Sequence, residues 1–209
     1  MKVIVIGATG QIGEIATRQL LEDGHTVTAF ARRPQRVESG HESLSLFAGD
    51  AFDAKTVEEA VAGHDAVVVT LGSGKSLTSK IRSRGTLNVI RAMHRHGVKR
   101  LIVQSTLGAH ESHVLLNFYW KRVMFGLILK RVFQDHELQE QLVWASGLDW
   151  TIVRPSAFAD GPATGQYIEN VATDAKRLKL RIARADIAAF LSRMVTDFTY
   201  NGRSVGITT

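Results

Sequence analysis

The glycine motif at the start of the chain constrains the fold more than any other feature. The apolar run 3–6 is typical of a buried parallel strand, and Gly7, Gly10 and Gly13 follow it at a spacing of three. The first glycine permits a tight turn, the second lets the backbone approach a pyrophosphate, and the third lets a helix over 11–22 pack against the strand. Free N–H groups at that helix N-terminus bind phosphates, whereas the alternative is a glycine turn without a ligand. The predicted dinucleotide site also includes Thr9, Gln11 and Ile12.

The end of the next expected strand, over 25–30, indicates which dinucleotide binds. An NAD site places an acidic side chain about twenty residues after the glycines, to hold the ribose 2′-hydroxyl. Arg32 and Arg33 stand there instead, and Arg36 follows closely. A guanidinium pairs bidentately with a 2′-phosphate and stacks on adenine, so the pattern favours NADP(H) over NAD. The alternative is a solvated basic turn.

The rest of the chain alternates strands with helices. Apolar runs predict further strands over 44–48, 65–70, 100–104, 150–153 and 204–207. Helical patterns fall between them over 54–62, 82–96, 133–146 and 185–196. The alternation predicts an α/β fold, a single Rossmann-like doubly wound parallel sheet with helices on both faces. Because no linker or repeat divides the 209 residues, we expect a single NAD(P)-binding domain over 1–209.

Composition and charge narrow the class of protein. The chain has no cysteine, which excludes disulfides and thiolate metal sites, and no metal is expected. No apolar run is long enough to cross a bilayer and the first residues form a core strand, so we expect a cytoplasmic protein without a transmembrane segment. The net charge of +6 comes from scattered basic residues without a base-reading helix, so nucleic acid is not an expected partner.

The residues that follow the strands are the next candidates for the cofactor site. Ligands of doubly wound sheets bind at the carboxyl ends of the strands. A carboxylate after the third strand can accept the adenine amino group, although a helix N-cap is its alternative role. Small residues after the fourth strand let a sugar and nicotinamide lie close. The candidates at these strand ends are Asp50, Ala51, Leu71, Gly72 and Pro155.

The combined motifs carry a family resemblance over nearly the whole chain. The matching stretches are GATGQIG at 7–13, VTAFARRPQRV at 27–37, GDAFD at 49–53, DAVVVTLG at 65–72, GTLNVIRAMHRHGVKRLI at 85–102, SGLDWTIVRP at 146–155 and DGPATGQY at 160–167. With these stretches the chain resembles an atypical short-chain dehydrogenase/reductase of the NAD(P)H-binding, NmrA-like type. Within that type it is most similar to the biliverdin reductase B, or flavin reductase, group. The resemblance implies an NADPH-dependent reductase with a shallow substrate site over the nicotinamide.

The chain departs from this family pattern at two places. The wider superfamily uses a Tyr-x-x-x-Lys pair as acid and pKa-lowering cation, and here none of the three tyrosines has a lysine four residues later. The biliverdin reductase B group has a histidine at the position of Ala157, which argues against a biliverdin-specific activity.

Ser105, Thr106 and His136 are the candidate catalytic residues. The two hydroxyls match the strand end of the family that contacts a substrate carbonyl, and Asp135 with His136 matches an Asp-His pair of the same group. Because histidine titrates near neutral pH, we expect His136 to act as a general acid. A surface or capping histidine is the alternative.

The segment 114–133 is rich in apolar and aromatic side chains, interrupted by four cations. We expect a lid whose rings stack on a flat acceptor; a core helix, a homodimer face and a membrane-surface helix are alternatives. The sequence therefore predicts hydride transfer from NADPH to a flat conjugated small-molecule acceptor, such as a flavin, quinone or tetrapyrrole. The rival hypothesis is a redox-sensing regulator that binds NADP(H) without turnover and acts through a protein partner.

Overall fold

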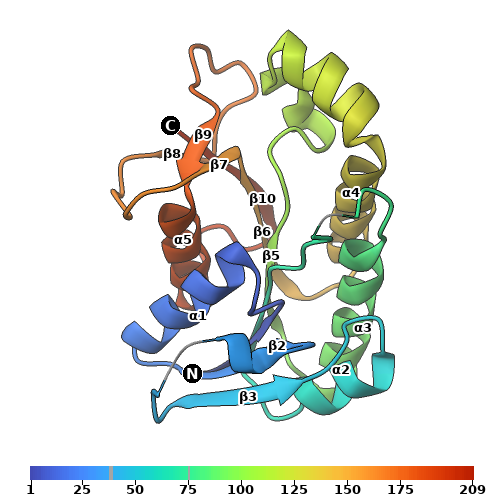
Figure 1. Ribbon diagram of the computed structural model, residues 1–209, viewed down its shortest axis with the longest axis vertical. Helices are drawn as coiled ribbons and strands as arrows, with labels where there is room; N and C mark the ends of the chain where they lie inside the picture. The colour runs from blue at the N-terminus through green and yellow to red at the C-terminus, as the bar shows by residue number, and fades with distance from the viewer. Residues whose placement is uncertain (38–39, 75) are drawn as a thin grey trace.

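An eight-stranded sheet organises the computed structural model, which describes residues 1–37, 40–74 and 76–209. The strand order is β3-β2-β1-β4-β5-β6-β10-β8, and the pairs are parallel except that β8 runs antiparallel to β10 (Figure 1). The strands are β1 Lys2–Ile6, β2 Thr26–Ala31, β3 Leu44–Ala48, β4 Ala66–Val69, β5 Arg100–Gln104, β6 Asp149–Pro155, β8 Ile168–Glu169 and β10 Arg203–Thr208. The predicted Rossmann-like fold is confirmed.

Helices cover both faces of this sheet (Figure 1). On one face α1 (Gln11–Glu22) packs against α5 (Arg184–Thr196), and on the other lie α2 (Ala54–Val61), α3 (Ile81–His96) and α4 (Lys130–Trp144). Successive side chains of β1 point to opposite faces. Val3 and Val5 therefore join the core beside α1 and α5, whereas Ile4 and Ile6 join the core beside α2 and α3. Burial on both faces explains why the strand is apolar at successive positions.

Some elements differ from the expectation. The sequence pattern did not predict β8 or the separate parallel pair β7 (Ala157–Ala159) and β9 (Arg181–Ala183), because two- or three-residue strands carry no readable period. The connection from β5 to α4 forms a 3₁₀-helix, η2 (His110–Leu115), and a π-helix, η3 (Trp120–Ile128), and α4 begins at Lys130 rather than Phe133. A short 3₁₀ turn, η1 (Pro34–Arg36), follows β2.

The order of the strands fixes where a ligand can bind. The winding reverses at β1, which pairs with β2 on one side and with β4 on the other. The loops after β1 and β4 therefore diverge to opposite faces and leave a crevice between them. Within the described ranges, no helix is long and apolar enough to span a bilayer.

Candidate functional site

A cleft of about 1180 Å³ lies at the carboxyl ends of the central strands. Its lining runs from the glycine motif after β1, past the loops after β4 and β5, to the segment that precedes α4. Pockets for drug-sized ligands usually measure about 300–1,000 Å³. The cleft therefore has room for an extended cofactor and a second molecule beside it.

The glycines occupy the first end of this cleft, and each has a different reason to be glycine. Gly7 has a φ of 97°, and a Cβ there would lie 2.9 Å from the carbonyl oxygen of Thr70. A Cβ on Gly13 would collide with the carbonyl oxygen of Gly7 and lie 2.6 Å from Oγ1 of Thr70, so Gly13 permits α1 to pack against β1 and β4. Gly10 is the N-cap of α1, where a Cβ would lie 3.2 Å from the carbonyl oxygen of Gly7, and no side chain of the described residues caps the helix. The first N–H groups of α1 are thus left for a ligand.

Five of the six motif residues expected at the cofactor site line the cleft. They are Gly7, Thr9, Gly10, Gln11 and Ile12. Gly13 does not line it, because it lies beneath the motif in the packing between helix and strand.

The arginines after β2 divide into two groups. Arg32 and Arg36 line the cleft, whereas Arg33 does not. The η1 turn places Arg36 next to the cleft instead of the adjacent Arg33, and sequence distance alone could not distinguish the two. Arg32 and Arg36 are both exposed residues.

The expected residues at the ends of β3, β4 and β6 are placed as follows. Asp50, Ala51, Leu71 and Gly72 line the cleft, and Pro155 does not. Pro155 belongs to β6, and its carbonyl oxygen accepts a hydrogen bond from the Leu107 amide at 2.8 Å. Its neighbours Ser156 and Ala157 line the cleft instead.

Asp50 is not the N-cap of the following helix. Its carboxylate accepts a hydrogen bond from the amide of Phe52 at 3.0 Å, within its own loop. Asp53 caps α2, accepting from the amide of Lys55 at 3.0 Å. The exposed Asp50 carboxylate keeps further lone pairs for a ligand in the cleft.

Ser105, Thr106 and His136 all line the middle of the cleft. The Ser105 hydroxyl lies 3.5 Å from Nδ1 of His136, and both side chains are buried. Burial and then the positive charge of Arg82 hold the pKa of His136 well below its ordinary value of 6.5. The expectation that His136 titrates near neutral pH is therefore wrong, because its protonated form would be desolvated beside another cation. A neutral imidazole can position the Ser105 hydroxyl but holds no extra proton to give.

Arg82 was not among the residues expected from the sequence. It stands in the first turn of α3, lines the cleft, and its side chain is 11% exposed. Its Nη1 donates to the Ser73 hydroxyl at 3.3 Å and lies 3.9 Å from a carboxylate oxygen of Asp135. Its Nε has no hydrogen-bond partner among the described residues. Burial lowers the pKa of Arg82, but an arginine still carries its charge at neutral pH. The cleft therefore contains a buried cation with an unused donor.

Two more buried polar atoms facing this region lack a partner in the described structure. They are Oε1 of Gln104 and Oγ of Ser156, and both residues line the cleft. Buried polar groups are nearly always hydrogen-bonded, so unpaired ones gathered in one cleft are expected where a ligand completes the bonding. No spacing pattern in the sequence identifies these atoms, since their isolation depends on the folded surroundings.

An aromatic wall closes the far end of the cleft. Trp120, Phe125 and Phe133 line it, with ring centroids 5.5 Å apart for Trp120 and Phe125 and 4.0 Å apart for Phe125 and Phe133. Leu116 and Leu129 line the same wall. The segment expected to form a lid thus contributes its inward rings to the cleft, while its ordering on ligand binding stays a prediction.

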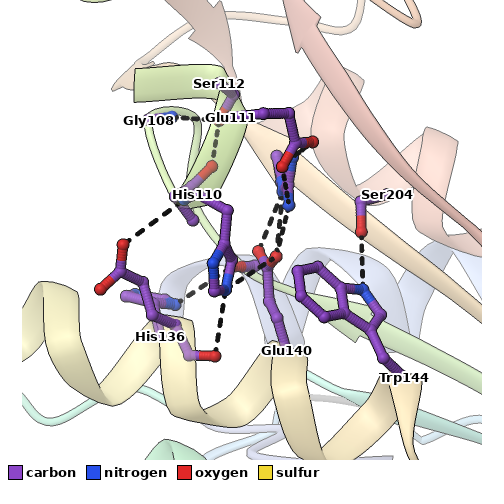
Figure 2. Close-up of polar contacts among 12 residues, drawn as sticks. Gly108, His110, Glu111, Ser112, His136, Glu140, Trp144 and Ser204 are labelled. Carbon is purple, nitrogen blue, oxygen red and sulfur yellow. Dashed lines mark hydrogen bonds and ion pairs between the residues drawn. The ribbon is translucent and has the colours of Figure 1, made fainter. Parts of the chain in front are cut away.

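A network of ion pairs holds η2, the turn that leads into this wall. Figure 2 shows the polar contacts around His110, Glu111 and Glu140. Arg154 on β6 donates from Nε to Oε1 of Glu140 at 3.0 Å and from Nη2 to Oε2 at 2.6 Å, and it also pairs with Glu111. These carboxylates raise the pKa of Arg154 although burial opposes its charge. The ring of His110 packs against that of Trp144 on α4, with the ring centroids 4.5 Å apart. The network therefore joins η2 to the sheet and to α4.

Asp135 fixes the other side of α4. Its carboxylate accepts hydrogen bonds from the amides of Arg82 and Ser83 at 3.1 and 3.2 Å, and from the Ser83 hydroxyl at 2.5 Å. It thereby caps the first turn of α3 from a neighbouring helix. The Asp-His pair thus divides its roles, because Asp135 docks α4 onto α3 and His136 faces the cleft.

Comparison with known proteins agrees with this geometry. The family model described as NAD(P)H-binding matches residues 7–198. An uncharacterised chloroplast protein of Arabidopsis thaliana is 29% identical over 179 residues, which cover 80% of this chain and 62% of that protein. The chain thus spans less than two thirds of that relative. YhfK of Bacillus subtilis, named an uncharacterised sugar epimerase, is 29% identical over 216 residues, covering 100% of this chain and 94% of YhfK.

Solved structures share the fold over the full chain. A short-chain dehydrogenase/reductase of Veillonella parvula in complex with NADP has a TM-score of 0.82 at 19% identity, covering 100% of this chain and 94% of that one. ChuY, an anaerobillin reductase of Escherichia coli, has a TM-score of 0.80 at 22% identity, covering 100% and 97%.

Proposed function

Because the chain belongs to the NAD(P)H-binding family, we propose that it is an NADPH-dependent reductase that transfers a hydride to a flat conjugated small molecule. The observation that carries the proposal is one continuous cleft that joins the open N-terminus of α1 to an aromatic wall, with Arg82, Ser105 and His136 between them. NAD(P)H binding follows from the family match, and the reductase activity is part of the proposal. The preference for NADPH and the flat acceptor are the proposed refinements.

The residues in the cleft suit NADPH along its length. The N–H groups of Gln11 and Ile12, in the first turn of α1, would bind the pyrophosphate, and Arg32 with Arg36 would bind the 2′-phosphate. The unpaired Oγ of Ser156 and Oε1 of Gln104 are suited to the amide group at the nicotinamide end. When bound, NADPH supplies the hydride and the protein supplies orientation.

Arg82 gives the site a way to work without a protein acid. A conjugated acceptor that gains a hydride gains a negative charge, which then takes a proton from water. The Arg82 guanidinium faces the cleft with a free Nε donor and can stabilise that charge as it develops. Neutral His136 holds the Ser105 hydroxyl in position for the acceptor carbonyl. These groups would take over the task of the missing Tyr-x-x-x-Lys pair.

The aromatic wall defines the class of acceptor. Trp120 and Phe125 offer faces on which a flat ring system stacks, each such pair contributing about 0.5–1.5 kcal/mol beyond area burial. ChuY, which is described as an anaerobillin reductase, supports this class by analogy. A regulator without turnover is not favoured, since such a protein needs no room for a second molecule beside the cofactor residues.

The decisive experiment is anaerobic NADPH oxidation with a panel of acceptors that contains FMN, a benzoquinone, a naphthoquinone and biliverdin. We expect turnover with at least one of them, and a raised KM for that acceptor in Phe125→Ala. Phe118→Ala is the matched control, because Phe118 belongs to the same segment but is 75% exposed and does not line the cleft. NADPH binding without oxidation by any acceptor would contradict the proposal and favour the regulator.

A further inference from the structure

The outer side of the segment before α4 exposes an unusual amount of apolar surface. Phe118 and Leu127 are 75% and 76% exposed, and Val114, Tyr119 and Ile128 are all more than half exposed. Single exposed apolar residues are common, but large ones gathered on one short segment mark an interaction site. This side faces away from the cleft, since none of these five residues lines it.

The same region carries a strong excess of positive charge. Between Glu111 and Asp135 the chain has no acidic residue and four cations, Lys121, Arg122, Lys130 and Arg131. The loop before β9 adds Lys176, Arg177 and Lys179, all exposed. Leu180 at the end of this loop lines the same cleft as Trp120, so both basic segments border one cleft mouth.

We propose that this apolar-basic face, made by the outward side chains of 114–131 together with Lys176, Arg177 and Lys179, docks on the surface of an anionic lipid bilayer. Apolar side chains flanked by lysine and arginine are the composition of interfacial helices, which bury one side at the acyl boundary and place cations at anionic headgroups. Docking of this kind needs no spanning helix. The charge argues against a second copy, because a two-fold interface would bring this basic face against itself.

Docking has a consequence for the reductase, and this step rests on the proposed function. The segment 116–133 presents Trp120 and Phe125 to the cleft and Leu127 and Ile128 to the outside. A bilayer against its outer side would place the cleft mouth at the lipid headgroups. A lipid-soluble acceptor such as a long-chain quinone could then enter without crossing water.

Vesicle flotation tests the docking independently of activity. We expect the protein to float with phosphatidylglycerol-containing vesicles and to stay in solution with pure phosphatidylcholine, and the binding to weaken as added salt shortens the screening length. Lys130→Gln/Arg131→Gln should weaken partitioning by about thirtyfold, since each cation near an anionic surface contributes about 1 kcal/mol. Leu127→Ser/Ile128→Ser should weaken it by on the order of tenfold or more.

Matched variants on other surfaces separate docking from general effects of charge and hydrophobicity. Arg91→Gln/Lys99→Gln removes the same charge from exposed sites on α3 and before β5, and should leave partitioning unchanged. Leu46→Ser/Leu138→Ser removes exposed leucines from β3 and α4 with the same expectation. Failure of the wild type to bind anionic vesicles at low salt would overturn the proposal. A dimer in light scattering that Leu127→Ser/Ile128→Ser dissociates would reassign the face to a second copy and overturn it equally.

Discussion

The Oγ atom of Ser105 lies 3.5 Å from the Nδ1 atom of His136, and both residues are buried at the middle of the cleft. The contact joins the end of β5 to α4, two elements that are 31 residues apart along the chain. It places His136 in the lining of the cleft, and the same burial holds the pKa of the imidazole well below 6.5. In the proposed function, His136 therefore orients the Ser105 hydroxyl and the nearby Arg82 carries the charge.

His136 should make the fold sensitive to acid. Its pKa is lowered in the folded protein, so below 6.5 the unfolded chain binds a proton that the native state does not, and stability falls as the pH falls. We expect the free energy of unfolding in urea to fall between about pH 7.5 and about pH 5 in the wild type. In His136→Gln this fall should be smaller, by up to about 1.4 kcal/mol per pH unit. Burial also lowers the pKa of His25 and His64, but both remain in each protein and cancel in the comparison. Equal losses of stability in the wild type and the variant would show that the pKa of His136 is not lowered by folding.

Arg82→Met should lower kcat far more than it changes NADPH affinity. Removing a preorganised donor that stabilises developing charge typically costs about 10²–10³ in kcat. Arg82→Lys should recover part of the rate that Arg82→Met loses, because lysine restores the positive charge. The recovery should be partial, because lysine lacks the Nε donor. Steady-state kinetics with the best acceptor and fluorescence titration with NADPH provide the two readouts. A loss confined to NADPH binding would instead assign Arg82 to the cofactor.

Arg32→Ala and Arg36→Ala should each weaken NADPH binding by about ten- to a hundredfold while leaving NADH binding almost unchanged. The loss corresponds to a charge-assisted contact of about 1.5–3 kcal/mol with the 2′-phosphate. Arg33→Ala is the matched control and should bind NADPH normally, because Arg33 does not line the cleft. Calorimetry on the three variants decides between them, and equal wild-type affinity for NADPH and NADH would refute the role of both arginines.

Gly10→Val and Gly13→Ala should fail in different ways. Gly10 has a φ of −78° and a ψ of 160°, which any residue adopts, so its valine variant should fold but fill the space above α1 and lose NADPH binding. Gly13→Ala pushes a methyl group into Gly7 and Thr70 and should cost about 1–3 kcal/mol of stability. Melting curves together with NADPH titrations separate the two outcomes. Normal NADPH binding by a folded Gly10→Val would show that the motif is only a turn.

Glu140→Gln should destabilise the fold by about 3–5 kcal/mol, because it leaves Arg154 buried with only the outer carboxylate of Glu111. Glu111→Gln is the control, since the Glu111 side chain is 58% exposed and should cost about 1 kcal/mol or less. The double variant Glu140→Leu/Arg154→Leu should recover much of the stability lost in Glu140→Gln. Chemical denaturation measures all three, and equal effects of the two glutamine variants would show that burial does not govern this network.

The sequence could predict the parts of this protein that local patterns encode. The run from Val3 to Ile6, the glycines after it and the helix Gln11–Glu22 all lie within one βα unit, and the structure places that helix at the predicted bounds. The order of strands and helices along the chain followed from the alternation of apolar runs with helical patterns. The family match over 7–198 agrees with the cofactor class that the glycine spacing indicates.

The roles of the arginines could not be predicted in this way. Arg154 and Arg100 look like members of the scattered basic set, yet both are buried at 2% and 3% exposure. Burial lowers the pKa of Arg100 to about 10, while carbonyl groups from α5 and the following turn receive its hydrogen bonds. Likewise Arg36, and not Arg33, reaches the cleft because of one short turn.

The sequence by itself determined the fold class and the class of cofactor, because strand and helix periodicity and glycine spacing act over a few neighbouring residues. Only the tertiary structure showed that Arg82 lines the cleft together with Ser105 and His136, and that burial lowers the pKa of that histidine. Arg82 meets Asp135 across 53 positions and Ser105 meets His136 across 31. A pKa and an unpaired donor depend on desolvation and on charges that such distant segments bring together, and no local pattern contains that information.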